Sequence, residues 1–129
     1  FVSTNNRDKP SVIPVVKDFI ELGFNIIATE GTKAALEAEG LEVELILKLH
    51  QGRPHVLDAI KNRNIQLIIN TPTGQEAQTD GQLIRRTALA YKIPMVTTIA
   101  GARANVAGIR ALQSGSLEVK ALQEYIQLG

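Results

Sequence analysis

The stretch "QLIINTPTG", residues 66–74, joins a short apolar run to a cluster of polar residues and glycine. The run "QLIIN" (66–70) does not alternate between apolar and polar positions, which is typical of a strand buried on both faces of a sheet. The same pattern recurs in three further segments, "NIIAT" (25–29), "VELIL" (43–47) and "PMVTTI" (94–99). With a short strand at residues 1–4, these segments predict a sheet of about five strands.

Segments with helical spacing separate the strands. Apolar residues between 12 and 20 recur on one helix face, and we expect this helix to begin near Ser11 and end at Gly23. Further helices are expected from Gly31 or Thr32 to Gly40, from Pro54 onward, from an N-cap at Asp80, and in the small-residue segment 100–115. The segments "LEVK" (117–120) and "ALQEYIQLG" (121–129) are expected to add a strand and a helix.

The strict alternation of strands and helices predicts an α/β fold, a three-layer sandwich in which helices cover both faces of a parallel sheet. A chain of 129 residues is long enough for one hydrophobic core and short for two, so we expect one domain over residues 1–129. The chain starts with Phe1 rather than Met. We therefore expect it to be a piece of a longer polypeptide.

The composition argues against several classes of function. Fourteen Lys and Arg residues against thirteen Asp and Glu leave a net charge of +1, so no strong field favours nucleic acid or an anionic membrane. The absence of cysteine excludes disulfide and thiolate chemistry and fits a reducing compartment. Because the sequence contains neither an apolar run of about 18 residues nor a secretory leader, we expect a cytoplasmic location.

Polar residues follow each predicted strand, at the edge of a parallel sheet where ligands usually bind. Lys48 comes directly after the segment 43–47, and Thr29, Thr32 and Asn70 occupy comparable positions. Two of these loops lead into helix N-termini, where free backbone N–H groups favour an anion. The pattern predicts a phosphate site with Lys48 as a point charge and the other three residues as directional donors. Since such residues are also common in turns and caps, the hypothesis rests on their recurrence.

Known catalytic and metal-binding patterns are absent. His50 and His55 are separated by five positions, which does not match the i, i+4 pair of a zinc site, and we expect no metal. The sequence contains no Gly-x-Ser-x-Gly, no phosphate-binding Gly-x-x-x-x-Gly-Lys and no Gly-x-Gly-x-x-Gly motif. Asp58 is expected in a helix, where a carboxylate is usually solvated or ion-paired. Arg85 and Arg86 are expected to face solvent or a partner domain.

Four motifs carry a resemblance to a known family. They are "ATEGT" (28–32), "KLHQGRPHVLDAIKN" (48–62), "IINTPTG" (68–74) and "IRRTALAYKIPMVTT" (84–98), and they occur in this order. Together they closely resemble the C-terminal allosteric domain of the carbamoyl phosphate synthetase large subunit, a domain of the methylglyoxal-synthase-like fold. The resemblance runs from Phe1 to past Ala107. It implies a non-catalytic domain from the C-terminal end of an ATP-dependent, glutamine-hydrolysing ligase.

The resemblance also implies a regulatory site. Bacterial members of this family bind UMP as inhibitor and IMP as activator at overlapping positions, and so control carbamoyl phosphate synthesis for pyrimidine and arginine biosynthesis. The family's phosphate contacts correspond here to Lys9, Thr29, Thr32, Lys48 and Asn70. The expected effector pocket adds His50, Thr71, Thr73 and Gly74, and Thr97 corresponds to a threonine associated with ornithine at the domain junction.

The implied partners are the synthetase domains of the same chain and a small glutamine amidotransferase subunit. The implied cofactors, ATP, Mg or Mn, and K, belong to the parent enzyme, and none is expected in this domain. We also expect effectors to order the segments 29–32 and 70–81, because mobility concentrates in loops at strand ends.

Two departures from the family bear on function. Pro72 stands where one bacterial type has a second phosphate-binding threonine, and it offers neither hydroxyl nor N–H, so that contact would pass to Thr71 or Thr73. Arg53 stands close to the place where methylglyoxal synthases keep a catalytic aspartate, and an arginine cannot act as a base near neutral pH. Two alternatives remain: a lyase that eliminates phosphate from dihydroxyacetone phosphate, and an interaction module without a ligand.

Overall fold

The computed structural model describes residues 1–71 and 74–114. Within these ranges a five-stranded, wholly parallel sheet has the order β3-β2-β1-β4-β5. The strands are β1 (Val2–Thr4), β2 (Ile27–Ala28), β3 (Glu44–Leu45), β4 (Ile68–Thr71) and β5 (Met95–Val96). In the central strand β1, Val2 pairs with Ala28 of β2 on one side and with Ile69 of β4 on the other. The predicted parallel sheet is confirmed, whereas the strand and helix expected at 117–129 lie outside the described residues.

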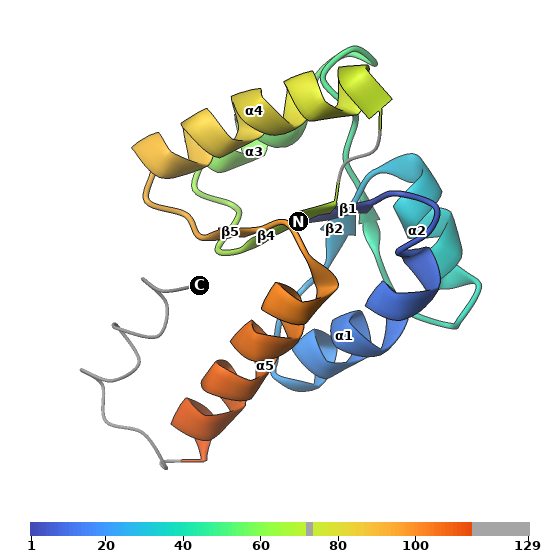
Figure 1. The fold of residues 1–129 in the computed structure, drawn as a ribbon, viewed down its shortest axis with the longest axis vertical. Coiled ribbons are helices and arrows are strands. Elements are labelled where there is room, and N and C mark those ends of the chain that lie inside the picture. The colour runs from blue at the N-terminus through green and yellow to red at the C-terminus, as the bar shows by residue number, and fades with distance from the viewer. Residues whose placement is uncertain (72–73, 115–129) are drawn as a thin grey trace.

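Helices cover both faces of the sheet, which confirms the three-layer sandwich. They are α1 (Lys9–Glu21), α2 (Glu30–Glu37), α3 (Val56–Lys61), α4 (Gly74–Ala90) and α5 (Ile99–Gln113). Figure 1 shows α3 and α4 on one side of the sheet and α1 and α5 on the other, with α2 beside α1. None of the helices within the described ranges is long and apolar enough to span a membrane.

The two layers of helices bury two apolar clusters, one on each face. Val12, Leu36 and Val106, from α1, α2 and α5, pack with Ile69 on one face. On the other face, residues of α3 and α4 pack with Ile68. Successive residues of β4 thus enter opposite clusters, as expected for a strand buried on both sides, and each such side chain contributes about 1.5–3 kcal/mol.

The prediction that residues 43–47 form a strand buried on both faces was wrong. Glu44 and Leu45 are exposed, Leu45 by 48%. The sheet order explains this, because β3 is an edge strand beside β2, and charged residues are common on sheet edges, where they oppose pairing with other chains. The predicted strand 94–99 is also shorter than expected, since β5 ends at Val96 and α5 begins at Ile99.

Three helix starts were predicted too late. α1 begins at Lys9 rather than Ser11, with proline in its first turn, and α2 begins at Glu30 after an N-cap at Thr29. The largest error concerns α4, which begins at Gly74 rather than after Asp80. The segment 74–79, "GQEAQT", lacks large apolar residues, so apolar periodicity could not reveal it, although Gln, Glu and Ala are good helix formers.

The small residues of α5 allow a close approach to the sheet, as predicted. A Cβ atom at Gly101 would lie 2.6 Å from Cγ1 of Val96, well inside van der Waals contact. Thr98 caps this helix, since its hydroxyl accepts the N–H of Gly101 at 3.0 Å.

Candidate functional site

The order in which the chain adds strands to the sheet reverses between β1 and β4. The chain moves outward from β1 to β2 and β3, then returns to the other side of β1 for β4 and β5. Crossovers on opposite faces leave a crevice outside the carboxyl ends of the strands at such a point. A cavity of about 460 Å³ lies there, within the usual range for small-molecule sites.

Six of the predicted site residues line this cavity. They are Lys9, Thr29, Lys48, His50, Asn70 and Thr71. They come from four separate chain segments: the start of α1, the residues after β2, the residues after β3, and the end of β4. The structure therefore brings together residues that lie up to 62 positions apart in the sequence.

The other predicted residues are placed differently. Thr32 is 1% exposed and does not line the cavity; its hydroxyl accepts the N–H of Thr4 at 3.0 Å. Thr97 is exposed, between β5 and α5, and is not part of the cavity wall. Gly74 is the first residue of α4, and Thr73 lies outside the described residues.

Two ammonium groups share the cavity. The side chain of Lys9 is partly buried, and its Nζ donates to the carbonyl oxygen of Thr4 at 2.7 Å. Its stem lies against Gly31, where a Cβ atom would be 3.6 Å from Cε. Burial lowers the pKa of Lys9, and the positive charge of Lys48 lowers it further. Because like charges disfavour each other here, an anion bound beside them would stabilise both.

The first turns of α1 and α2 face the same space. Thr29 is buried, and its hydroxyl lies 3.1 Å from that of Ser3, which also lines the cavity. Thr29 is the N-cap residue of α2, yet its side chain makes no capping hydrogen bond with the helix. The N-terminus of α2 therefore retains first-turn N–H groups that this side chain does not use, and such groups favour anions.

Polar residues fix the loop that follows β1. The N–H of Asn5 donates both to the carbonyl oxygen of Thr71, at 2.9 Å, and to its hydroxyl, at 3.1 Å. The side-chain oxygen of Asn5 accepts the N–H of Asp8 at 2.8 Å, immediately before α1. These bonds hold the start of α1, and with it Lys9, against the end of β4.

The opposite wall of the cavity is apolar and includes residues that the sequence did not suggest. Leu49, Val56 and Ile84 line it, and Asp80 contributes one carboxylate. Asp80 was interpreted as an N-cap, but it lies inside α4. Ile84 and the buried Ala88 follow it at i+4 and i+8. That spacing could have indicated that Asp80 faces inward.

Arg53, by contrast, does not line the cavity. It is exposed, and its guanidinium donates to Asp58 through Nε, at 3.2 Å, and through Nη2. The hydrogen bond from Arg53 holds the pKa of the Asp58 carboxyl well below its usual range, and the backbone N–H of His55 adds to this effect. Of the two states expected for Asp58, solvated or ion-paired, the structure shows the ion pair. Arg85 and Arg86 are also exposed, as predicted.

The described residues contain no group of three or more His, Cys, Asp or Glu side chains that could hold a metal ion. What the site offers is cationic and hydroxyl groups on one side and an apolar wall on the other. This arrangement suits a small organic anion, with the anionic group near the lysines and the organic body against the wall.

Fold and site together define an α/β domain of the doubly wound type with a cavity suited to anions at its topological switch point. The sequence profile of the MGS-like domain matches residues 11–97, and the chain belongs to this family.

Proteins similar to this chain are named as large chains of carbamoyl phosphate synthase. The chain is 65% identical over 125 residues to the carbamoyl phosphate synthase large chain of a Nostoc species, and 57% identical over 127 residues to that of a Synechocystis species. It is 44% identical over 129 residues to the chloroplastic, arginine-specific large chain of Arabidopsis thaliana. These matches cover 97% to 99% of this chain and 11% to 12% of each relative. The chain thus corresponds to one domain of such a large chain.

Proposed function

We propose that this domain is a regulatory, effector-binding part of a carbamoyl phosphate synthase large chain, and that it binds a nucleoside monophosphate without catalysing a reaction. The observation that carries the proposal is the cavity at the carboxyl ends of the strands, where Lys9 and Lys48 face an apolar wall. The phosphate would lie at the two lysines, with Thr29 and Asn70 as hydrogen-bonding partners.

The nucleoside would occupy the remainder of the cavity. Its base would pack against Leu49, Val56 and Ile84, and Asp80 is placed to accept a hydrogen bond from a sugar hydroxyl or a base N–H. UMP as inhibitor and IMP as activator fit this description, since both combine a phosphate with a ribose and a flat base. For ornithine, the exposed Thr97 is the proposed contact at a junction with another domain.

The wider setting is also part of the proposal. The other domains of the chain and a small glutamine amidotransferase subunit would be the partners, and ATP, Mg or Mn, and K would bind outside this domain. The names of the relatives support carbamoyl phosphate synthesis, and one of them is arginine-specific. A role in pyrimidine and arginine biosynthesis and a cytoplasmic location complete the proposal, although the Arabidopsis relative is named chloroplastic.

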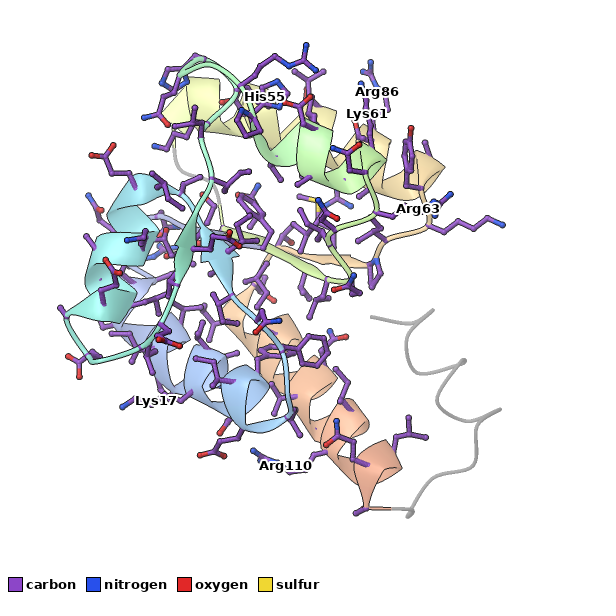
Figure 2. The ribbon with its side chains drawn as sticks, turned by 180° about the vertical axis from the view of Figure 1, so that it is seen from behind. Lys17, His55, Lys61, Arg63, Arg86 and Arg110 are labelled. Carbon is purple, nitrogen blue, oxygen red and sulfur yellow. The ribbon has the colours of Figure 1, made fainter. Side chains whose placement is uncertain are left out.

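Calorimetric titration with UMP, IMP and inorganic phosphate tests the proposal. We expect the wild-type domain to bind, and Lys48→Ala to weaken binding by about 10-fold or more, because a hydrogen bond to a charged group is lost. Lys17→Ala is the matched control, since Lys17 is exposed on α1 and lies on the far side of the sheet from His55 (Figure 2). Absence of binding by the wild type to all three probes would favour a ligand-free interaction module.

One observation favours a second candidate function. Asp80 places a carboxylate in the cavity, and a carboxylate is what a lyase acting on dihydroxyacetone phosphate needs as a base. Arg53 cannot supply that group, because it carries a guanidinium that stays protonated, and it is paired with Asp58 outside the cavity. Incubation with dihydroxyacetone phosphate separates the two functions: methylglyoxal formation that Asp80→Asn abolishes would establish the lyase, and we expect none.

A further inference from the structure

The segment 48–55, between β3 and α3, carries two residues of the cavity, Lys48 and His50. A single parallel bridge between Leu47 and His55 brings its two ends together. Its first half is a tight turn, in which the N–H of Gln51 donates to the carbonyl oxygen of Lys48 at 3.0 Å. The side chain of Gln51 in turn accepts the N–H of Lys48 at 2.8 Å. The first half of this loop is thus internally ordered.

The second half is held by one carboxylate. Gly52 has a φ of 125°, a conformation that needs glycine, and the chain then passes through Arg53 to His55. Asp58, on the first turn of α3, accepts the N–H of His55 at 3.0 Å. It also accepts two donors from the guanidinium of Arg53, one of them at 3.2 Å. Asp58 therefore joins the end of the loop to the helix that follows.

This junction adjoins the cavity directly. His55 is the N-cap of α3 and Val56 is its first residue, and Val56 is part of the cavity wall. Figure 2 shows His55 where the loop enters α3. The side chain of Asp58 is 13% exposed and that of Arg53 77% exposed, so the pair joins a largely buried carboxylate to an arginine on the surface.

We propose that Arg53 and Asp58 are positioning residues for the bound anion: their ion pair fixes the second half of the loop against α3 and thereby holds Lys48 and His50 at the cavity. This inference rests on the proposed function and concerns the same site. Without the guanidinium of Arg53, the loop would be tied to α3 through His55, by its bridge to Leu47, its N–H to Asp58 and its carbonyl oxygen to the N–H of Ala59. The ligand would then have to order Lys48 and His50 as it binds, at a cost in affinity.

A double-mutant cycle tests whether Arg53 acts through Lys48. The variants are Arg53→Ala, Lys48→Ala and the double variant, titrated with UMP and separately with inorganic phosphate. We expect Arg53→Ala to bind both probes about 3- to 10-fold more weakly than the wild type, since residues coupled through shared contacts show effects of this size. In the Lys48→Ala background the same change should have a much smaller effect, because the ammonium that it positions is gone.

Two further variants separate positioning from charge and from loss of structure. Arg85→Ala removes an exposed arginine that does not line the cavity and should leave both affinities unchanged. Arg53→Lys keeps the charge but cannot form two parallel hydrogen bonds, so it should restore only part of the affinity. Unfolding temperatures of all variants, measured in parallel, should show that Arg53→Ala remains folded at the temperature of the titration.

The outcomes are distinct. If the wild type binds and Lys48→Ala binds weakly, but Arg53→Ala binds as the wild type does, the positioning role is overturned while the proposed function stands. Equal losses from Arg53→Ala in both backgrounds would also overturn it, because independent effects add. If the wild type binds neither probe, the proposed function itself fails. Non-additive losses with both probes, and no loss in Arg85→Ala, would establish the role.

Discussion

The two sides of the cavity are built in different ways. The first side includes Thr29, which follows β2, and Asn70 and Thr71, which end β4, and all three are buried. The residues that follow β3, by contrast, include Lys48 and His50, which are exposed on a loop beside an edge strand. The first side is part of the buried core, and the second is a surface loop. Changes on the first side should therefore alter stability, and changes on the second should alter binding.

The largest expected effect is on the buried side. Thr32→Val keeps the volume of the side chain but removes the acceptor for the buried N–H of Thr4. Leaving a buried donor without a partner costs about 1–3 kcal/mol, and we expect the free energy of unfolding, measured with urea, to fall by that amount. Thr97→Val is the control, because Thr97 is exposed. Equal stability of the two variants would show that the hydrogen bond from Thr4 to Thr32, behind the buried side of the cavity, does not stabilise the core.

The next effect concerns Lys9, which lies between the two sides. Burial and the charge of Lys48 both lower the pKa of Lys9. A bound phosphate would favour the charged form of Lys9. At pH values near this lowered pKa, binding should therefore be accompanied by uptake of a proton. Above the second pKa of the phosphate, about 6, the affinity for UMP should fall as the pH rises through the pKa of Lys9. We expect Lys9→Met to bind about 10-fold more weakly near neutral pH, consistent with loss of a charged hydrogen bond.

Calorimetry at several pH values checks this dependence. The matched variant is Lys9→Arg, which keeps its charge across the range and should lose the part of the alkaline decline that comes from Lys9. An identical alkaline decline in Lys9→Arg and the wild type would show that the proton is taken up elsewhere.

The same comparison explains how far the sequence could predict the molecule. The run 66–70 predicted a central strand correctly, because burial on both faces leaves only apolar residues between 67 and 69. The run 43–47 has a similar composition but forms an edge strand, and only the sheet order distinguishes the two. The cavity lies at the strand ends that the sequence indicated, whereas Thr32 lies outside its lining and Asp80 lies inside α4 rather than at its start. Their orientation depends on where α2 and α4 begin, and local patterns leave those starts uncertain by several residues.

A third, smaller effect is expected on the stability of the domain at acidic pH. Arg53 holds the pKa of Asp58 well below its value of 3.8 in an unfolded chain. Because the folded-state pKa is depressed, the unfolded chain takes up the proton first, so the stabilisation is complete above about pH 5 and is lost as the pH falls through and below 3.8. The stability of Asp58→Asn, measured by urea unfolding between neutral pH and pH 3, should therefore decline less steeply than that of the wild type. Parallel declines would show that other carboxylates dominate the acid response.

The smallest effect should be seen in hydrogen exchange on binding, and it sharpens the comparison most directly. Ordering of residues 29–32 by an effector was one expectation from the sequence, but in the structure this segment is the N-cap and first turn of α2, with Thr29 and Thr32 buried. Those amides should therefore change little at saturating UMP. Amides of residues 48–55 lie on the exposed loop and should gain protection, because fixing Lys48 and His50 on the ligand suppresses local opening. Exchange measured by mass spectrometry with and without UMP distinguishes the two segments. If amides of residues 29–32 gained more protection than those of residues 48–55, the segment at α2 would be the adaptable side of the cavity and the loop after β3 the rigid one.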